Sequence, residues 1–269
     1  MVFNLNYKEF LRRSVAQPLC SFTATGNSLY VAKRIKEKIN DCELVCIPKI
    51  SEQEEMVLDD DVIGFVYPIH YAGVPITMYD FLSKLKIKRE SYVFAVGVSG
   101  GGASNTSFYQ INKLIGRNID NCLSIKYTSN YLKLGTNPSE KNLKDAIAKY
   151  DDKIEEFIEV IGKRQKKSCK FVSILGKYEY RFFKDTLKNK DKKFNSNDNC
   201  NGCGICTKIC PAENISIIDN KPKWNGKCID CMACINICPK KAINIGNSTV
   251  NKNRYRNPYI SLSELIRGE

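Results

Sequence analysis

The most constraining feature of this sequence is a cysteine pattern that occurs twice near the C-terminus. The first copy is Cys200, Cys203, Cys206, Cys210 and Pro211, and the second is Cys228, Cys231, Cys234, Cys238 and Pro239. This spacing is C-x2-C-x2-C-x3-C-P, which in bacterial proteins ligates [4Fe–4S] clusters through thiolates. Because such clusters carry single electrons, the pattern predicts a redox protein.

The spacing also predicts how the ligands are shared. Each cluster has four iron corners that each take one soft thiolate, and three closely spaced cysteines can reach three of them. In two-cluster ferredoxins the fourth cysteine of each run ligates the other cluster. We therefore expect two sets, the first made of Cys200, Cys203, Cys206 and Cys238, and the second of Cys228, Cys231, Cys234 and Cys210.

Zinc binding and disulfide formation explain the two cysteine runs less well. Structural zinc sites favour two separated C-x2-C pairs or mixed Cys and His ligands around one ion, and disulfides are typical of small secreted domains. Small residues also suit a cluster: Gly202 and Gly204 let the backbone approach the first one closely, and we expect Ala233 to do so at the second.

Length and cysteine content indicate a cytoplasmic protein of two domains. The chain has 269 residues, more than a typical single domain. Five cysteines outside the two runs are expected to be reduced core residues, namely Cys20, Cys42, Cys46, Cys122 and Cys169. Residues 1–17 have no apolar signal-peptide core, and polar residues and prolines interrupt the longest apolar stretch, so we expect no direct membrane insertion.

The formal net charge of +13 has two explanations that remain open. Lysines can simply be solvated surface residues, or they can form a field that attracts an acidic redox partner protein. Nucleic-acid binding ranks below both, because no nucleic-acid motif accompanies the charge. The sequence leaves the oligomeric state open.

Apolar runs alternate with amphipathic segments between residues 18 and 167. The expected strands are Leu19–Phe22, Leu44–Ile47, Val62–Tyr67, Tyr92–Val98 and Leu123–Tyr127. The expected helices are Ser28–Ile39, Ile76–Leu85, Ser107–Ile115 and Glu140–Ile161, with a helical turn near Ser51–Met56. Such alternation predicts an α/β doubly wound parallel sheet of order 2-1-3-4-5, with ligands at the carboxyl ends of the strands.

The loop after the first expected strand is rich in hydroxyls. It contains Thr23, Ala24, Thr25, Gly26, Asn27 and Ser28, and it runs directly into a helix. Hydroxyls and backbone N–H groups at a helix N-terminus can hold a phosphate, and FMN is a phosphate monoester that fits a loop without Lys or Arg. The alternative is an ordinary turn in which a Thr or Ser side chain caps the helix.

Two further loops complete a resemblance. One contains Pro68, Ile69, His70, Tyr71, Ala72 and Gly73, and the other contains Ser99, Gly100, Gly101, Gly102 and Asn105. Together with the hydroxyl loop they resemble the FMN-binding loops of flavodoxin. With the cysteine runs, residues 18–269 resemble flavodoxin–ferredoxin fusion proteins of anaerobic bacteria and archaea, as does the segment Arg254–Pro258.

The resemblance implies roles for the loop residues. Tyr71 would stack on or edge the isoalloxazine, backbone near Ala72 and Gly73 would contact flavin N5, and amides of residues 99–102 would contact the pyrimidine end. No aromatic residue follows Ser99 before Phe108, so one flavin face is expected to be open to substrate or covered by the ferredoxin module. His70, the one histidine, is either a proton donor or a space-filling residue.

The resemblance and the pattern together divide the chain into four parts. Residues 1–17 are an N-terminal extension with a helix expected at 7–14, and residues 18–167 are a flavodoxin-like FMN-binding domain. Residues 168–193 are a linker with a short helix. Residues 194–269 are a small α+β bacterial ferredoxin-like domain, with a hairpin at 215–224, Trp224 beside a cluster and a capping box at Ser261.

The function that we expect is electron transfer between FMN and two [4Fe–4S] clusters, and on to redox partner proteins. The main alternative is an enzyme in which FMN reduces a small acceptor, such as a quinone or nitro compound, and the clusters supply the electrons. A third hypothesis is a scaffold whose flavodoxin-like half only docks partners. A G-x-G-x-x-G dinucleotide fingerprint is absent from the sequence, so we expect no tight pyridine-nucleotide site.

Overall fold

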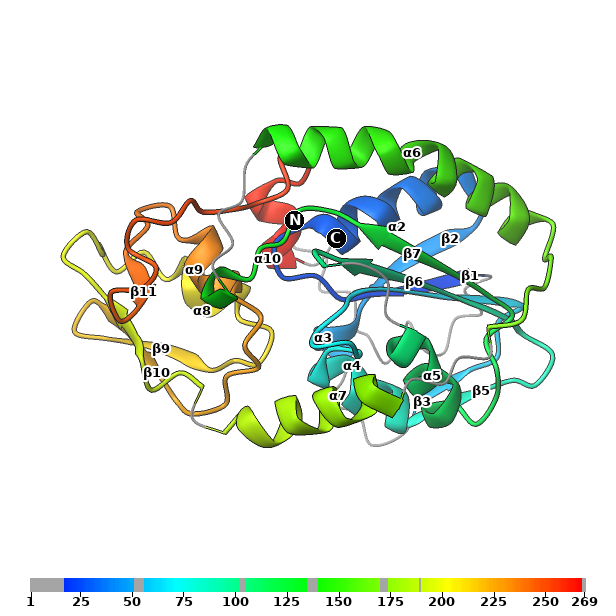
Figure 1. Cartoon of the computed structure of the whole chain (residues 1–269), viewed down its shortest axis with the longest axis horizontal. Helices are drawn as coiled ribbons and strands as arrows, with labels where there is room; N and C mark the ends of the chain where they lie inside the picture. The colour runs from blue at the N-terminus through cyan, green and yellow to red at the C-terminus, as the bar shows by residue number, and fades with distance from the viewer. Residues whose placement is uncertain are drawn as a thin grey trace, which may run out of the picture.

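The structure is a computed structural model that describes residues 17–50, 56–101, 105–134, 140–169, 174–188 and 190–267. The helix expected at 7–14 lies outside these residues. Figure 1 shows a sheet module on one side and a smaller cysteine-rich module on the other, with α7 (Ile174–Thr186) running along the lower edge. Within the described residues, none of the helices is long and apolar enough to span a membrane.

The sheet module is built on five parallel strands. They are β1 (Gln17–Ser21), β2 (Cys42–Cys46), β4 (Val62–Pro68), β6 (Tyr92–Ser99) and β7 (Asn121–Lys126). Their spatial order is β2-β1-β4-β6-β7, which confirms the doubly wound order 2-1-3-4-5. Every residue of β6 is buried, because this near-central strand is covered on both faces.

Helices cover both faces of the sheet (Figure 1). On one face α2 (Asn27–Lys38) and α6 (Glu140–Gly162) pack their apolar sides against Val66, Val96 and Val98. On the other face α4 (Ile76–Ser83) and α5 (Asn105–Leu114) pack against Phe65 and Ala95. The carboxyl ends of all five strands therefore point to one edge, where the loops of the expected FMN site lie.

One small parallel pair was not predicted. It consists of β3 (Met56–Leu58) and β5 (Leu85–Ile87), and the expected helix 76–85 ends at Ser83 because Leu85 already belongs to β5. Buried and solvent-facing residues alternate in β3, which is typical of a strand. The helical turn expected at 51–56 is wrong at Met56, and 51–55 lie outside the described residues. A four-residue helix, α3 (Ile47–Ile50), precedes them.

The cysteine-rich module consists of short elements. They are β8 (Phe194–Ser196), α8 (Ile205–Ile209), β9 (Ile215–Ile218), β10 (Lys221–Trp224), α9 (Ala233–Ile237) and β11 (Ile243–Ile245). The predicted hairpin is confirmed as β9 and β10, joined by Asp219 and Asn220, which both have positive φ. Strands β8 and β11 form a second antiparallel pair.

The two cysteine runs repeat the same backbone. Left-handed residues recur in pairs 28 residues apart, namely Gly202 and Asp230, Gly204 and Met232, and Glu213 and Lys241. Helix α9 follows α8 at the same spacing. The expectation that Ala233 takes the place of Gly204 is therefore wrong, because Ala233 lies one residue further along, inside α9, and Met232 occupies the equivalent position.

The C-terminal segment joins the two modules. Helix α10 (Leu262–Arg267) begins with the predicted capping box: Ser261 N donates to Glu264 Oε2, and Glu264 N donates to Ser261 Oγ. A single buried cluster contains Ala24 and Leu29 of the sheet module and Ile237 and Leu265 of the C-terminal region. The modules therefore share a hydrophobic core.

Candidate functional site

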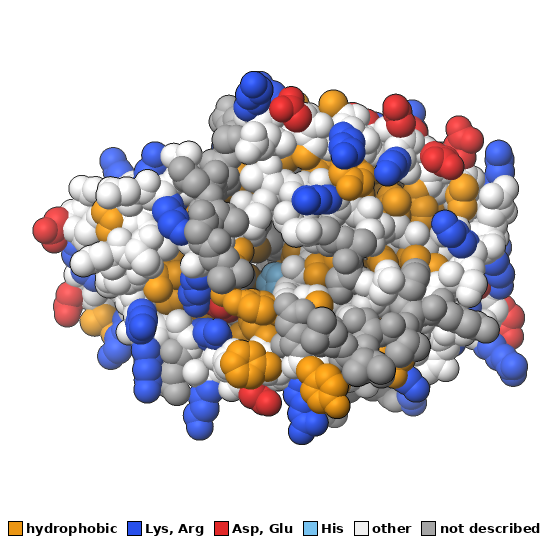
Figure 2. Space-filling model, viewed as in Figure 1, with side chains coloured by type: hydrophobic (Ala, Val, Ile, Leu, Met, Phe, Trp, Pro, Cys, Tyr) orange, Lys and Arg blue, Asp and Glu red, His pale blue; other side chains and the backbone are white. Residues whose placement is uncertain are grey.

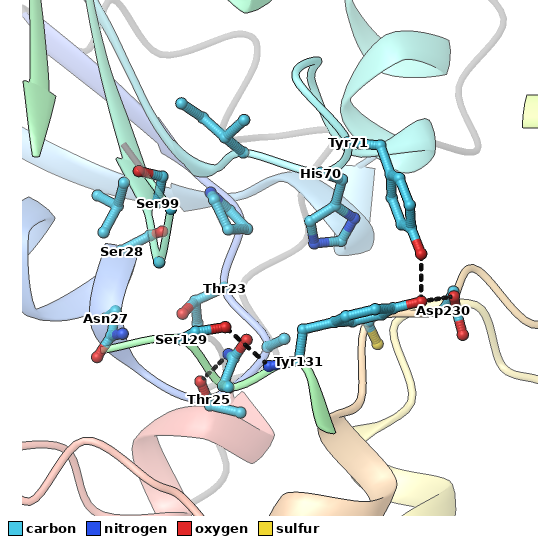
Figure 3. Close-up of a pocket in the computed structure, with 18 of the residues that line it drawn as sticks. Thr23, Thr25, Asn27, Ser28, His70, Tyr71, Ser99, Ser129, Tyr131 and Asp230 are labelled. Atoms are coloured by element: carbon cyan, nitrogen blue, oxygen red, sulfur yellow. Dashed lines mark hydrogen bonds between the residues drawn. The ribbon is translucent and has the colours of Figure 1, made fainter. Parts of the chain in front are cut away.

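A cavity of about 630 Å³ lies at the carboxyl ends of the strands. The loops after β1, β4, β6 and β7 line it, and Phe183 of α7 together with Asp230 and Cys231 of the second cysteine run complete its wall. It thus lies between the two modules. Figure 3 shows the hydroxyl residues on one side and His70, Tyr71 and Asp230 on the other.

The hydroxyl loop and the loop after β7 each provide one unpartnered hydroxyl beside the cavity. Five of its predicted residues line the cavity: Thr23, Ala24, Thr25, Asn27 and Ser28. Gly26 is the N-cap of α2 and no side chain caps this helix, so the alternative of an ordinary Thr or Ser cap is wrong. The hydroxyls of Ser28 and Thr128 are buried without a hydrogen-bond partner in the described residues. A phosphate would satisfy both hydroxyls and the free amides of the helix.

Gly26 itself lies behind the loop rather than in the cavity wall. A Cβ at this position, where φ is +102°, would come within 2.9 Å of Asn257 Cβ. Asn257 N donates to Thr25 O at 2.8 Å, and the hydroxyl of Tyr255 donates to Asn27 Oδ1 at 2.5 Å. The C-terminal segment therefore supports the hydroxyl loop from outside, and only glycine leaves room for it.

The loop after β4 is a strained turn at the cavity wall. Pro68, Ile69, His70, Tyr71 and Ala72 line the cavity. His70 and Gly73 exchange two backbone hydrogen bonds of 2.9 Å, and the two residues between them have φ of 44° and 66°. Such left-handed pairs are costly without glycine and are often found at ligand sites.

Gly73 does not line the cavity, although it was predicted as a cofactor residue. A Cβ at this position would lie 2.2 Å from Cδ2 of Tyr180. The structure thus gives Gly73 a packing reason, because the loop after β4 needs glycine here for α7 to approach.

His70 is packed edge-on between two aromatic rings. Its ring centroid lies 6.1 Å from that of Phe22 and 6.5 Å from that of Phe183. Burial lowers the pKa of His70 to about 4, and the nearby carboxylate of Asp230 opposes this shift. His70 is therefore neutral at pH 7 and can offer a hydrogen bond in the cavity rather than a positive charge.

Glycine in the loop after β6 permits a close backbone approach. Ser99, Gly100 and Gly101 line the cavity, and a Cβ on Gly100 would lie 2.5 Å from Ser129 Cα. Asn105 begins α5 with an exposed side chain and does not line the cavity. The predicted residue Gly102 lies outside the described residues.

The loop after β7 also lines the cavity, although the sequence did not predict it. It contributes Thr128, Ser129, Asn130 and Tyr131 to the cavity wall. Asn130 Nδ2 donates to Thr25 Oγ1, which ties this loop to the hydroxyl loop. Tyr131 provides an aromatic wall that the loop after β6 lacks. Their position in the sequence could have predicted this role, because these polar residues directly follow the fifth strand, where ligand contacts are expected.

Tyr131 connects the cavity to the second cysteine run. Its hydroxyl donates to Asp230 Oδ2 at 2.8 Å and also pairs with the hydroxyl of Tyr71, as the dashed lines of Figure 3 show. The side chain of Asp230 is fully buried and forms ion pairs with Lys133 and Lys190. Burial raises the pKa of Tyr131 well above its usual value, so this phenol stays protonated.

The predicted ligand cysteines lie in two groups. Cys200, Cys203, Cys206 and Cys238 line one pocket. In the other set, burial and the neighbouring thiols Cys228, Cys210 and Cys231 together raise the pKa of Cys234.

Backbone amides point at several of these sulfurs. Asn214 N lies 3.4 Å from Cys210 Sγ, and Ala242 N lies 3.3 Å from Cys238 Sγ at the equivalent position of the other run. The indole N–H of Trp224 is buried and has no hydrogen-bond partner of good geometry in the described residues. It lies near Cys234 and lowers the pKa of that thiol, which favours the thiolate. Such donors fit the sulfurs of an iron–sulfur cluster.

The cysteine sets do not form a site for a single ion. In the described part of the chain, no three Cys, His, Asp or Glu side chains converge closely enough to hold one metal ion. Burial raises the pKa of Cys228 to about 11, so its free thiol keeps its proton until a cation binds. Spread sulfurs of this kind suit a cluster, in which each thiolate reaches a separate iron.

Comparison with known proteins agrees with this part of the chain. Residues 199–243 match the family described as 4Fe-4S dicluster domain. The chain therefore combines a five-stranded parallel sheet of order 2-1-3-4-5 with a C-terminal segment that matches a 4Fe-4S dicluster domain. A search of curated proteins finds no match to the sequence.

Solved structures of low similarity are also found. A flavoprotein from Bacteroides uniformis is 15% identical with a TM-score of 0.35, over 44% of this chain and 94% of that one. A flavoprotein in complex with FMN from Lactobacillus acidophilus is 18% identical with a TM-score of 0.29, over 40% and 91%. An FMN-dependent NADH-azoreductase from Bacillus anthracis is 11% identical with a TM-score of 0.36, over 53% and 99%.

Proposed function

We propose that this protein is a flavodoxin–ferredoxin fusion that transfers electrons between one FMN and two [4Fe–4S] clusters, and on to redox partner proteins. One observation carries the proposal: a single cavity is bounded at one end by the hydroxyl loop and at the other by Cys231 of a cluster-binding run. A flavin in this cavity would lie against a cluster ligand without any rearrangement of the two modules.

The cavity suits FMN from end to end. The amides of α2, with the unpartnered hydroxyls of Ser28 and Thr128, would hold the phosphate. The loops that carry Tyr71 and Ser99, together with Tyr131, would surround the isoalloxazine. Bound FMN exchanges electrons singly or in pairs, which matches it to clusters that carry one at a time.

The two cluster sets would have different positions in the electron path. The set that includes Cys231 borders the cavity and would be the one near the flavin. Among the thirteen cysteines, all of them in described segments, only Cys203 is exposed, and it belongs to the other set. We therefore place the exit to partner proteins at Cys203.

The aromatic residues at the ring end favour an electron carrier over the alternative of a small-acceptor reductase. Tyr71 stacks on Phe183 with ring centroids 4.3 Å apart and planes 14° apart. Tyr131 lies edge-on to Tyr71 and is fixed by Asp230. A substrate would need to displace these rings, whereas electrons can pass through the wall to the adjacent cluster.

The proposed partners are acidic redox proteins, as the net charge of +13 suggests. Figure 2 shows Lys and Arg side chains spread over the visible face rather than gathered in one patch. The charge would therefore raise encounter rates generally. We also propose a cytoplasmic location, because reduced thiols and clusters need a reducing compartment.

Anaerobic purification followed by iron, sulfide and flavin quantification tests the proposal. We expect about eight irons per chain, from two four-iron clusters, and one FMN. Electron paramagnetic resonance of the reduced protein should show two interacting clusters. Zinc in place of iron, or full iron without flavin after reconstitution, would contradict the proposal. Saturable steady turnover of a quinone would favour the reductase instead.

A further inference from the structure

Two thiols outside the cluster sets lie in contact. Cys122 is on edge strand β7, and Cys169 is in the segment that follows α6. Their sulfur atoms are 2.7 Å apart, although the residues are far apart in the sequence and were expected to be separate core thiols. We propose that Cys122 and Cys169 form a redox-active dithiol that a small disulfide, such as oxidised glutathione, converts to a protein disulfide.

The contact is fixed by the backbone on both sides. Lys167 N donates to Asp120 O at 2.8 Å, and Asn121 Nδ2 donates to Gln165 O at 3.1 Å, so the segment runs beside the start of β7. Asn112 of α5 donates to the carbonyl of Cys169 at 3.1 Å. These bonds hold the two sulfurs together without a covalent link, which removes most of the entropy cost of closing the ring.

The two thiols differ in access. Cys122 is half-buried, whereas Cys169 is 1% exposed. The Cys169 thiol donates its hydrogen to the Cys122 sulfur, and this bond lowers the pKa of Cys122. Cys122 is therefore the accessible nucleophile and Cys169 is the resolving thiol behind it.

The reaction proceeds in two exchanges. The Cys122 thiolate attacks one sulfur of the small disulfide, so a mixed disulfide forms and one small thiolate leaves. Cys169 then attacks Cys122 Sγ, which forms the Cys122–Cys169 bond and releases the second small thiol. Two electrons and the two cysteine protons pass to the small disulfide, which becomes two thiols.

The bond would tie the sheet edge to the chain that enters α7. Residues 165–169 lead towards the helix whose Phe183 stacks on Tyr71 in the cavity wall. The disulfide would therefore fix one end of this connection under oxidising conditions. This inference does not depend on FMN or on the clusters, because neither cysteine belongs to the predicted ligand sets.

Peptide mapping of the holoprotein tests the inference. The full chain is treated anaerobically with oxidised glutathione, alkylated, digested with trypsin and analysed by mass spectrometry. Trypsin separates the two cysteines into peptides 118–126 and 168–170, which contain no other cysteine. We expect these peptides to be recovered mainly as one linked species that is two hydrogen atoms lighter than their sum, and dithiothreitol should separate them.

Variants assign the order of attack. In Cys169→Ser we expect glutathione to remain on Cys122, and in Cys122→Ser we expect Cys169 to stay free. Cys42→Ser is the matched control, because Cys42 is a half-buried thiol on the other edge strand, β2, and this variant should keep the cross-link. If Cys169→Ser does not fold, a time course on the unaltered chain must show glutathione on Cys122 before the link appears. Recovery of both peptides as free thiols in excess oxidised glutathione would overturn the proposal.

Discussion

The two cysteine runs have the same backbone but different surroundings. Each has a five-residue helix after its second left-handed turn position, and each directs an amide to its last cysteine at 3.3–3.4 Å. In the first run, however, Cys203 is exposed at the surface, whereas Cys231 at the equivalent position of the second run borders the cavity. The duplication therefore fixes the backbone that would hold a cluster, and the neighbouring module decides what each cysteine run faces.

The difference is visible at two equivalent turn positions. The first run has Gly202 and Gly204 there, and the second has Asp230 and Met232 with nearly the same φ. A side chain in this conformation costs roughly 1 kcal/mol. The second run offsets the cost, because Asp230 accepts the hydrogen bond from Tyr131 and Met232 is buried beside Leu132. Asp230 and Met232 thus join the second run to the sheet module, whereas the equivalent glycines of the first run make no such contacts through side chains.

The largest expected effect separates the two clusters. Cys231→Ala and Cys203→Ala change equivalent ligands, so each should lower the iron content from about eight to about four per chain. Flavin-to-cluster transfer, followed by anaerobic stopped-flow absorbance, should be lost in Cys231→Ala and retained in Cys203→Ala. Equal loss in the two variants would show that the clusters do not differ in their distance from the flavin.

A buried ion pair of the second run should matter more than an exposed pair of the first. Asp230→Asn leaves Lys133 partly buried without its carboxylate and should cost about 3 kcal/mol of unfolding free energy. Asp198→Asn removes an exposed partner of Lys221 and should cost less than about 0.5 kcal/mol. Urea unfolding under anaerobic conditions measures both. Similar midpoints for the two variants would contradict the structural role of Asp230.

His70 faces the second run across the cavity, and its lowered pKa predicts that the unfolding free energy depends on pH. Its pKa is about 4 in the folded protein and about 6.5 when unfolded, so below pH 6.5 the unfolded chain takes up a proton that the folded chain does not. The unfolding free energy is therefore unaffected by His70 well above pH 6.5, and protonation of the unfolded chain lowers it by about 2 kcal/mol by pH 5. Between high pH and pH 5, the unfolding free energy of the FMN-free protein should fall by about 2 kcal/mol more than that of the FMN-free His70→Gln variant. Parallel pH profiles for the two proteins would argue against a neutral His70.

The smallest effect compares the two glycines of the first run. Their φ values are 70° and 73°, but a Cβ on Gly202 would lie 3.1 Å from Asn220 O, whereas a Cβ on Gly204 would meet nothing closer than 4.0 Å. Gly204→Ala should therefore cost about 1 kcal/mol, from conformation alone, and Gly202→Ala about 2 kcal/mol. Thermal unfolding measures the difference. A more destabilising Gly204→Ala would show that cluster contacts, rather than Asn220, set the requirement for glycine.

The sequence alone determined the features that depend on neighbours along the chain. The cysteine spacing predicted the iron–sulfur motifs, which match a 4Fe-4S dicluster domain. The β9–β10 hairpin followed from Asp219 and Asn220 between apolar runs, and Ser261 with Glu264 predicted the start of α10. Alternating apolar segments predicted the order of the parallel strands, because their crossover connections leave few arrangements. In each case the pattern along the chain leaves few possible arrangements of the elements.

Only the tertiary structure decided which distant segments meet. It brought Tyr131 and Asp230 to the cavity wall, placed Asn257 behind Gly26, and put Cys122 against Cys169. Each of these contacts joins residues far apart in the sequence, and each depends on how two packed surfaces fit rather than on a repeated spacing. The pattern along the chain names the candidate ligand cysteines, but the packing of the modules selects which cysteine run lies beside the cavity.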